Sequence, residues 1–278
     1  MPDTDALVTT EWLADHLDDP SVIVVEVDED VDAYRDGHIP GAVGWNWHSD
    51  LHHGVRRDYL DREGILDLLR ASGVDGDTTV VLYGGNNNWF AAYAYWLLRM
   101  RGFEAVRLLD GGRTKWEREG RELTAEFPSV EAGDLEQLGP ERPELRALRD
   151  RVLQRVVDGG AAFVDVRSAE EFSGEKLAPD HLPQEQPYVG GHIPGAHNIS
   201  WSKAAREDGS FRPVEELEEL YGDVLEEPEA IAYCRIGERA AHTWFVLSEL
   251  LGHPNARNYD GSWTEYGSLV DVPVERGS

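Results

Sequence analysis

A repeated hexapeptide constrains the fold of this chain more than any other feature. Gly-His-Ile-Pro-Gly-Ala stands at Gly37–Ala42 and again at Gly191–Ala196, 154 positions later. Self-similarity at a nearly fixed offset indicates a duplicated structural unit, so we predict two copies of one domain of about 125 residues. Two further blocks recur in the same order at an offset of 150: Val80–Tyr83 with Ala230–Tyr233, and Leu109–Gly112 with Tyr259–Ser262.

Both copies alternate short apolar strands with helices. This order predicts an α/β fold in which each copy forms a parallel sheet flanked by helices. We expect a first domain at residues 1–125, a linker rich in Pro, Gly and acidic residues at 126–144, and a second domain at 145–278. An additional stretch of the second copy, Ser173–Tyr188, is expected to be a surface loop. The expected strands are Val22–Val27, Thr79–Tyr83, Ala105–Leu109, Ala162–Val166, Ala230–Tyr233 and Ala256–Tyr259, and the expected helices are Thr10–Leu17, Gly64–Ala71, Trp89–Met100, Leu145–Val157, Val214–Tyr221 and Ala240–Leu251.

The chain is strongly acidic. Its 26 Lys and Arg stand against 54 Asp and Glu, which gives a formal net charge of −28, and lysine occurs only at Lys115, Lys176 and Lys203. Such a surface repels phosphate backbones and anionic bilayers, so we expect neither nucleic-acid nor membrane partners. The composition predicts a halophilic source, where salt screens the self-repulsion; the alternative is an acidic enzyme from a mesophile.

The chain contains one cysteine, Cys234, which excludes an intramolecular disulfide. The first residues lack the basic and apolar regions of a secretion signal. No apolar run approaches the roughly 18–20 residues needed to span a bilayer. We therefore expect a soluble, cytoplasmic protein.

Cys234 follows a predicted strand, and the segment Cys-Arg-Ile-Gly-Glu-Arg leads from it into a helix. Inward backbone N–H groups, the helix end and the guanidinium groups of Arg235 and Arg239 favour a thiolate, so we expect the thiol pKa to fall from about 8.5 into a range of about 3.5–7.5. The same groups would bind an anionic substrate. Two alternatives are open: Cys234 is a small hydrophobic core residue, or the two arginines form surface ion pairs with Glu238.

The length of the loop narrows the chemistry. Cys234 and Arg239 form a Cys-x4-Arg pattern, one residue shorter than the Cys-x5-Arg loop of cysteine phosphatases. A shorter loop makes a smaller bowl around the sulfur. This size favours a thiolate that carries one extra sulfur atom over a thiolate that engages a whole phosphoryl group.

Three segments together resemble the signatures of the two-domain rhodanese sulfurtransferases, in particular the thiosulfate type. They are Tyr188–Ile199 around the second hexapeptide, Cys234–Arg239 with the following Ala, and Ala256–Tyr266, and the resemblance covers nearly the whole chain. The first copy has Gly84 at the position of Cys234, followed by Gly and three Asn. The resemblance therefore implies a catalytically inactive first domain and a catalytic second domain.

The resemblance implies a thiosulfate sulfurtransferase activity. Thiosulfate would pass its outer sulfur to Cys234, sulfite would leave, and the persulfide would pass its sulfur to cyanide, a small thiol or a protein thiol. No metal ion and no organic cofactor would be required. The candidates for substrate binding are Arg239, which would bind the sulfonate oxygens, then Arg235, and then Arg167, which follows the first strand of the second copy. The alternative for Arg167 is an exposed residue at a helix start.

Two other functions remain open. One is a 3-mercaptopyruvate sulfurtransferase or a persulfide carrier for sulfur biosynthesis, and the other is a rhodanese-fold regulatory module without turnover, which the intact Cys234 loop disfavours. Near the loop, Glu238 either orients Arg235 or faces solvent. The hexapeptide histidines, His38 and His192, are expected to be structural, because the first copy keeps its histidine without a cysteine.

Overall fold

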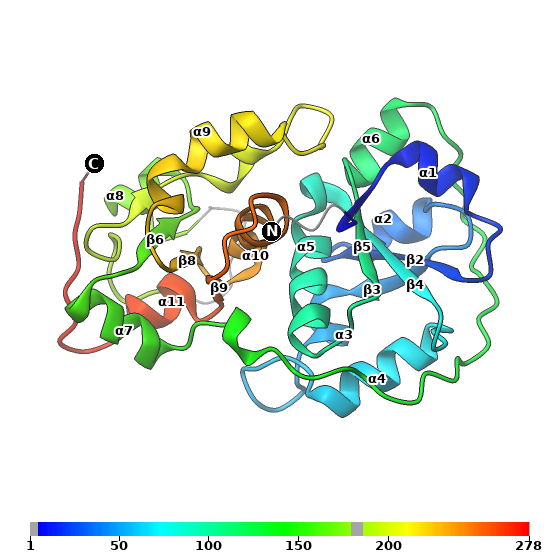
Figure 1. Ribbon diagram of the computed structural model, residues 1–278, viewed down its shortest axis with the longest axis horizontal. Coiled ribbons are helices and arrows are strands. Elements are labelled where there is room, and N and C mark those ends of the chain that lie inside the picture. Colours follow the sequence, from blue (N-terminus) through cyan, green and yellow to red (C-terminus); the bar gives the residue numbers. More distant parts are fainter. Residues whose placement is uncertain (1–4, 179–185, 278) are drawn as a thin grey trace. The chain divides into compact units, whose positions relative to one another are not determined.

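The computed structural model describes residues 5–178 and 186–277 (Figure 1). It has the expected α/β fold, with two parallel sheets that are each flanked by helices. The chain divides into two compact units, one made of Thr4–Pro143 with Arg206–Phe211, the other of Glu144–Ala205 with Arg212–Ser278. Of the expected surface loop Ser173–Tyr188, residues 179–185 lie outside the described residues.

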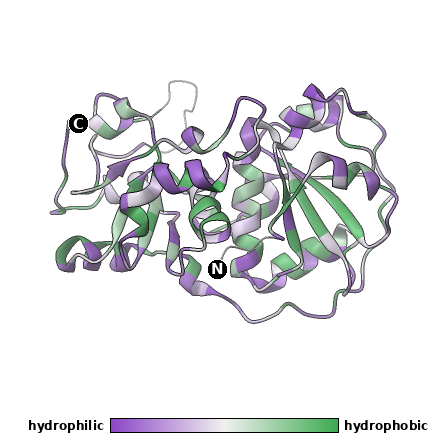
Figure 2. Ribbon diagram, turned by 45° about the horizontal axis from the view of Figure 1, so that its top comes forward, coloured by the Kyte–Doolittle hydropathy of each residue, from purple (hydrophilic) through white to green (hydrophobic). Residues whose placement is uncertain are grey.

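The N-terminal unit contains a five-stranded parallel sheet in the order β1-β5-β4-β2-β3. Helix α5 packs against β2, β4 and β5, and a core cluster joins Leu13 of α1 and Trp116 of α6 to Val81 of β4. Coverage of both faces explains the continuous apolar sequence of the central strands, which Figure 2 shows in green. The elements are β1 Leu7–Val8, α1 Thr10–Asp15, β2 Val22–Asp28, α2 Val31–Asp36, β3 Val43–Asn46, α3 Trp47–Leu51, α4 Arg62–Ala71, β4 Thr79–Tyr83, α5 Gly85–Met100, β5 Val106–Leu109 and α6 Gly112–Arg118.

The C-terminal unit contains a four-stranded parallel sheet in the order β7-β6-β8-β9. Val152 of α7, Ile231 of β8 and Trp263 of α11 belong to one core cluster, while α10 packs against β8 and β9. The carboxyl end of β8 therefore lies inside the unit, with helices around it. The elements are η1 Pro143–Leu145, α7 Arg149–Asp158, β6 Ala162–Asp165, α8 Ala169–Ser173, β7 His197–Asn198, η2 Trp201–Ala204, α9 Val214–Leu225, β8 Ala230–Tyr233, α10 Glu238–Phe245, η3 Val246–Leu250, β9 Ala256–Tyr259 and α11 Ser262–Tyr266.

The hexapeptide makes the same contacts in both units. The backbone N–H groups of Ile39 and Ile193 each donate to the hydroxyl of the tyrosine that ends the interior strand, at 2.9 and 3.1 Å. Nδ1 of His38 and Nδ1 of His192 each lie 2.8 Å from a backbone carbonyl oxygen of the preceding helix. Both histidines thus hold the turn against its own unit, which is the structural role expected for them.

The structure differs from the expectations in three additional edge strands and in the bounds of one helix. The strands β1, β3 and β7 are additional; they are two to four residues long and lie at sheet edges, where no apolar run marks them. The helix expected at Ala240–Leu251 begins at Glu238 and continues beyond Phe245 as a π-helical turn. None of the described helices combines the length and the apolar character that crossing a membrane requires.

The segment between the two copies packs along the N-terminal unit. Guanidinium groups of Arg62 and Arg70 donate to backbone carbonyl oxygens of Leu135, Leu138 and Gly139 at 2.5–2.8 Å. The side chains of Leu135 and Leu138 are buried. A segment without regular structure is thus held in place by two arginines of α4.

Candidate active site

Cys234 lies directly after β8, at the carboxyl end of an interior strand, where α/β proteins commonly bind ligands. Its side chain has no exposed surface. Its backbone N–H donates to Oγ of Ser262 at 3.0 Å, and its carbonyl oxygen accepts the N–H of Trp263 at 3.0 Å. The segment that follows β9 therefore fixes the backbone of the cysteine.

Gly237 turns the loop back toward the sulfur. Its φ is +97°, and a Cβ at this position would lie 2.4 Å from Cα of Asp260, so only glycine fits. The N–H of Gly237 donates to Sγ of Cys234 at 3.1 Å. The N–H of Ala240, in the first turn of α10, also favours the thiolate. Backbone N–H groups thus surround the sulfur, as expected for a tight loop before a helix.

Arg239 is buried and held by Glu171 of α8. The two groups form a bidentate ion pair at 2.9 and 3.0 Å, with side chains that are 5% and 3% exposed. Burial opposes ionisation of Glu171, yet the hydrogen bonds and charge of Arg239 hold the pKa of this carboxyl below its usual value. Arg239 is therefore not a surface residue. Its Nε lies 4.0 Å from Oε1 of Glu238, beside the cysteine loop.

Arg235 is fully buried as well. Its carbonyl oxygen accepts the N–H of Thr264 at 3.0 Å, and its charge acts to lower the pKa of Glu238. The charges of Arg235 and Arg239 thus both act on Glu238, the residue that contacts Cys234. The alternative interpretation, in which both arginines form ion pairs at the surface, is therefore wrong, because both side chains are buried.

Arg167 is also buried, so it is not the exposed helix-start residue of the alternative interpretation. It donates to Asp165 through Nε at 2.9 Å and Nη2 at 2.5 Å, and to the carbonyl oxygen of Gly191 at 2.7 Å. Its guanidinium carbon lies 4.9 Å from the centre of the Trp263 ring. None of these described contacts joins Arg167 to Cys234, and its role in substrate binding remains a prediction.

The thiol of Cys234 is less acidic than the loop pattern predicts. Burial, followed by the charge of Glu238, raises its pKa to about 11, and the charge of Arg239 with the surrounding N–H groups offsets this only in part. Complete removal from water disfavours the thiolate. The charge of Arg239 is also largely neutralised by Glu171. The free thiol is therefore protonated at neutral pH.

Glu238 lies against this thiol. Its Oε2 is 3.4 Å from Sγ of Cys234, and only 2% of the residue is exposed. Burial raises the pKa of the Glu238 carboxyl, although Arg239 and Arg235 act in the opposite direction. Of the two alternatives for Glu238, the one in which it faces solvent is thus wrong. Its position four residues after the cysteine, in the first turn of α10, is the sequence signal for this contact.

The comparison with known proteins follows the same division of the chain. A family model described as "Rhodanese-like domain" matches residues 9–119 and again residues 148–269. The chain belongs to the rhodanese family. This confirms the resemblance of the sequence motifs and the presence of two rhodanese domains.

Relatives of this rhodanese match nearly its full length. A protein of Saccharopolyspora erythraea named "Putative thiosulfate sulfurtransferase" is 54% identical over 277 residues, covering 99% of this chain and 98% of the relative. Sulfur carrier protein TtuD of Thermus thermophilus is 48% identical over 279 residues, covering 98% and 97%. Among solved structures, the anaerobic ergothioneine biosynthesis enzyme from Chlorobium limicola, in complex with trimethyl histidine, matches with a TM-score of 0.83 at 25% identity, covering 99% of this chain and 71% of that chain.

The N-terminal rhodanese domain has Gly84 at the position of Cys234, and the backbone of its loop differs: Asn86–Asn88 all have positive φ, whereas Gly237 alone does so in the described Cys234–Arg239 loop. One backbone contact is common to both loops. The carbonyl oxygen of Gly84 accepts the N–H of Arg113 at 3.0 Å, the counterpart of the contact between Cys234 and Trp263. Here the side chain of Asn88 occupies the loop: it accepts the N–H of Gly84 at 3.0 Å and donates to the carbonyl oxygen of Leu109, the last residue of β5, at 2.6 Å. In the N-terminal domain the Asn88 side chain therefore bonds the first residue of the loop.

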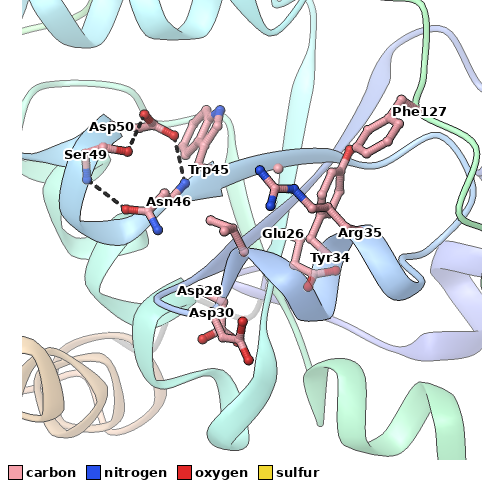
Figure 3. A pocket seen from close by; sticks show the side chains of 12 residues that line it. Glu26, Asp28, Asp30, Tyr34, Arg35, Trp45, Asn46, Ser49, Asp50 and Phe127 are labelled. Carbon is pink, nitrogen blue, oxygen red and sulfur yellow. Dashed lines mark hydrogen bonds between the residues drawn. The ribbon is translucent and has the colours of Figure 1, made fainter. Parts of the chain in front are cut away.

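A pocket of about 330 Å³ lies elsewhere in the N-terminal rhodanese domain, beside the edge strand β3 (Figure 3). Four carboxylates and three aromatic rings line much of it. Negative charge of this density is unsuited to a dianion such as thiosulfate. Its lining residues are Glu26, Asp28, Asp30, Val31, Tyr34, Arg35, Gly44, Trp45, Asn46, Ser49, Asp50 and Phe127.

Two residues of the C-terminal site were not anticipated from sequence. Glu171 carries the ion pair with Arg239 and also forms a capping box with Ser168. The spacing Ser-x-x-Glu could have revealed the cap, but not the arginine 68 positions away. Ser262 bonds the Cys234 N–H, and its match to Gly112 of the first copy was the available signal.

Proposed function

We propose that this rhodanese is a thiosulfate sulfurtransferase whose chemistry resides in the C-terminal domain. Cys234 takes the sulfane sulfur of thiosulfate as a persulfide, sulfite leaves, and a thiophilic acceptor, cyanide or a thiol, removes the sulfur. The N-terminal domain, which has Gly84 in place of the cysteine, does not react. Sulfur transfer as such agrees with the names of relatives that match nearly the whole chain.

The observation that carries this proposal is the position of the Cys234 sulfur. It accepts an N–H from Gly237 at 3.1 Å, and the charge of buried Arg239 acts to lower the pKa of the thiol. Both effects favour negative charge on the sulfur and on an anion bound next to it. The short Cys-x4-Arg loop favours a thiolate that carries one added sulfur atom over one that engages a whole phosphoryl group. Arg239 is the first candidate for the sulfonate oxygens, because its charge acts on the Cys234 sulfur. Its Nη1 and Nη2 also hold Glu171, so an anion bound here would share the guanidinium with that carboxylate.

One observation favours a second candidate function. The relative in Thermus thermophilus is named a sulfur carrier protein and matches 98% of this chain. In that function Cys234 would carry the same persulfide, but a protein thiol rather than cyanide or a small thiol would take the sulfur. The donor could then be mercaptopyruvate or another sulfur compound.

The intact mass of the protein tests the proposal. Incubation with thiosulfate should add about 32 Da, one sulfur atom, and cyanide should remove it, because the reaction proceeds through a covalent intermediate. Cys234→Ser should show no addition. A wild-type protein whose mass does not change with thiosulfate but increases with mercaptopyruvate would support the second candidate. If neither donor adds mass, the proposal is wrong, and the result supports the third function, a rhodanese-fold module without turnover.

A further inference from the structure

We propose that Glu238 is a catalytic residue that takes the proton of the Cys234 thiol before sulfur transfer and returns it when the sulfur departs. The inference rests on the proposed function, and it assigns to this carboxylate a proton transfer that the backbone N–H groups and the arginines do not perform. Those groups stabilise negative charge on sulfur but accept no proton.

The geometry is that of a proton donor and acceptor. Sγ of Cys234 lies 3.4 Å from Oε2 of Glu238, within the reach of an S–H···O hydrogen bond. The two residues are 0% and 2% exposed. A proton leaving the buried thiol therefore has a carboxylate oxygen at contact distance.

Charge conservation explains why the transfer suits a buried site. Moving the proton from sulfur to carboxylate leaves the pair with one negative charge before and after the step, so the interior gains no net charge. Burial raises the pKa of both groups, so it opposes a second negative charge on the pair. With the proton on Glu238, a dianionic donor meets one anion, the nucleophile, instead of a thiolate and a carboxylate.

The charged groups packed around the pair come from several elements. Arg235 and Arg239 lie on the loop and on α10, and both act to lower the pKa of Glu238. Glu171 of α8 is committed to Arg239. Asp260, whose backbone abuts Gly237, is bound by Arg146 at 2.8 and 2.9 Å. The neighbouring carboxylates are therefore engaged by arginines, and Glu238 is the carboxylate whose oxygen contacts the sulfur.

The duplicated domain provides an internal comparison. Glu238 and Asn88 lie at the same offset of 150 residues that relates Cys234 to Gly84. In each domain this side chain is directed at the first residue of the loop: Asn88 binds the N–H of Gly84, and Glu238 contacts the sulfur of Cys234. The position has a carboxylate in the domain with the thiol and an amide in the domain without it.

The first half-reaction balances with this assignment. The S–H bond of Cys234 breaks, an O–H bond forms on Glu238, and the electron pair stays on sulfur. The thiolate then attacks the sulfane sulfur of thiosulfate; a new S–S bond forms, and the S–S bond of thiosulfate breaks with its electron pair going to sulfite. The enzyme retains a persulfide anion and a neutral Glu238, and no external oxidant or reductant is needed.

The second half-reaction restores the starting state. An anionic acceptor, a thiolate or cyanide, attacks the outer sulfur of the persulfide, and the bond between that sulfur and Sγ of Cys234 breaks. The departing Cys234 sulfur takes the proton from Glu238. The acceptor leaves as a persulfide anion or thiocyanate, and the pair is again a thiol and a carboxylate.

The pH dependence of sulfur loading tests the role of Glu238. We expect wild-type loading, followed as intact mass in a single turnover, to vary less than about threefold between about pH 7 and 9, because the thiol proton passes to Glu238 and no proton is exchanged with solvent. In Glu238→Gln the thiol must release its proton to solvent, so the rate should rise about tenfold per pH unit. Glu238→Asp, which keeps a carboxylate, should restore the plateau at a lower rate.

Controls separate this inference from the proposed function. Glu218→Gln, an exposed change on α9, should behave as wild type. A plateau that persists in Glu238→Gln, or a tenfold rise per pH unit in the wild type, would overturn the role of Glu238 while leaving thiosulfate sulfur transfer intact. If no variant loads sulfur, the proposed function fails, and the same pH profiles measured as alkylation of Cys234 by iodoacetamide decide the question for Glu238.

Discussion

Ser262 and Gly112 adopt the same left-handed backbone, with φ of +51°, at matching positions of the two rhodanese domains. In the N-terminal domain a Cβ at Gly112 would lie 2.2 Å from Oδ1 of Asn88, so this position requires glycine. In the C-terminal domain the serine accepts an unfavourable conformation, and its Oγ binds the N–H of Cys234 at 3.0 Å and the carbonyl oxygen of Tyr259 at 2.6 Å. The strained backbone of Ser262 therefore lies at the residue whose hydroxyl holds the backbone of Cys234.

Replacement of Ser262 should separate stability from activity. Ser262→Gly removes both the backbone strain and the hydroxyl, two effects of about 1 kcal/mol each and opposite sign, so the free energy of unfolding should change little. Ser262→Ala keeps the strain and loses the hydrogen bonds, and should destabilise the protein by about 1–2 kcal/mol. Both should slow sulfur loading. Chemical denaturation and single-turnover loading measure the two effects; equal destabilisation by both variants would contradict the explanation.

Arg239 should matter more for thiosulfate than for mercaptopyruvate. If its guanidinium binds the sulfonate, Arg239→Ala should lower kcat/KM for thiosulfate by about 30-fold, which corresponds to about 2 kcal/mol for a charged hydrogen bond. The loss with mercaptopyruvate, which lacks a sulfonate, should be several-fold smaller. Parallel assays with the two donors measure the ratio, and equal losses would argue against the assignment.

The ion pair between Arg239 and Glu171 makes a double variant necessary as a control. Arg239→Ala leaves the buried Glu171 without its ion-pair partner, which alone costs stability. The double variant Glu171→Gln, Arg239→Ala removes that unpaired charge. It should unfold at a higher temperature than the single variant but show the same preference between donors, because the preference depends on the missing guanidinium.

Buried His242 should make the protein sensitive to moderate acid. Burial lowers its pKa from 6.5 to about 3. As the pH falls below about 6.5, the unfolded chain takes up this proton before the folded one does, so the contribution of His242 to stability is complete above that pH and declines toward pH 3. Between about pH 7 and 5 the wild type should lose about 2 kcal/mol more unfolding free energy than His242→Leu. Parallel losses measured by urea denaturation would refute this.

The sequence predicted the interior strands well and the edges poorly. The bounds of β4 and β8 agree with the expectation, because each is a short apolar run buried on both faces of a parallel sheet. The edge strand β9 is the exception, since its bounds agree although its sequence is not an apolar run. The short edge strands β1 and β7 have two residues each, and their pairing depends on the neighbouring strand more than on their own residue types. A periodicity argument cannot identify an element of this length.

The sequence predicted where the candidate site lies, but it did not predict the direction in which the thiol pKa shifts. A cysteine after an apolar strand and before a helix predicts a thiol beside backbone N–H groups, and Gly237 donates such a bond to Cys234. The degree of burial and the ion pair between Arg239 and Glu171 depend on packing between distant segments. Burial, followed by the charge of Glu238, changes the expected pKa of the thiol from lowered to raised.

Salt should support both stability and substrate capture in this protein. The net charge of −28 repels itself and repels thiosulfate, whereas Arg235 and Arg239 are buried and less screened than the surface. Raising the salt concentration shortens the Debye length from about 10 Å at 0.1 M to about 3 Å at 1 M. We therefore expect a higher Tm and a faster second-order rate of sulfur loading in 1–2 M KCl than in dilute buffer. Sucrose, which stabilises folded proteins without screening charge, is the control. A loading rate and a Tm that are the same in dilute buffer and in molar KCl would contradict the halophilic interpretation of the composition.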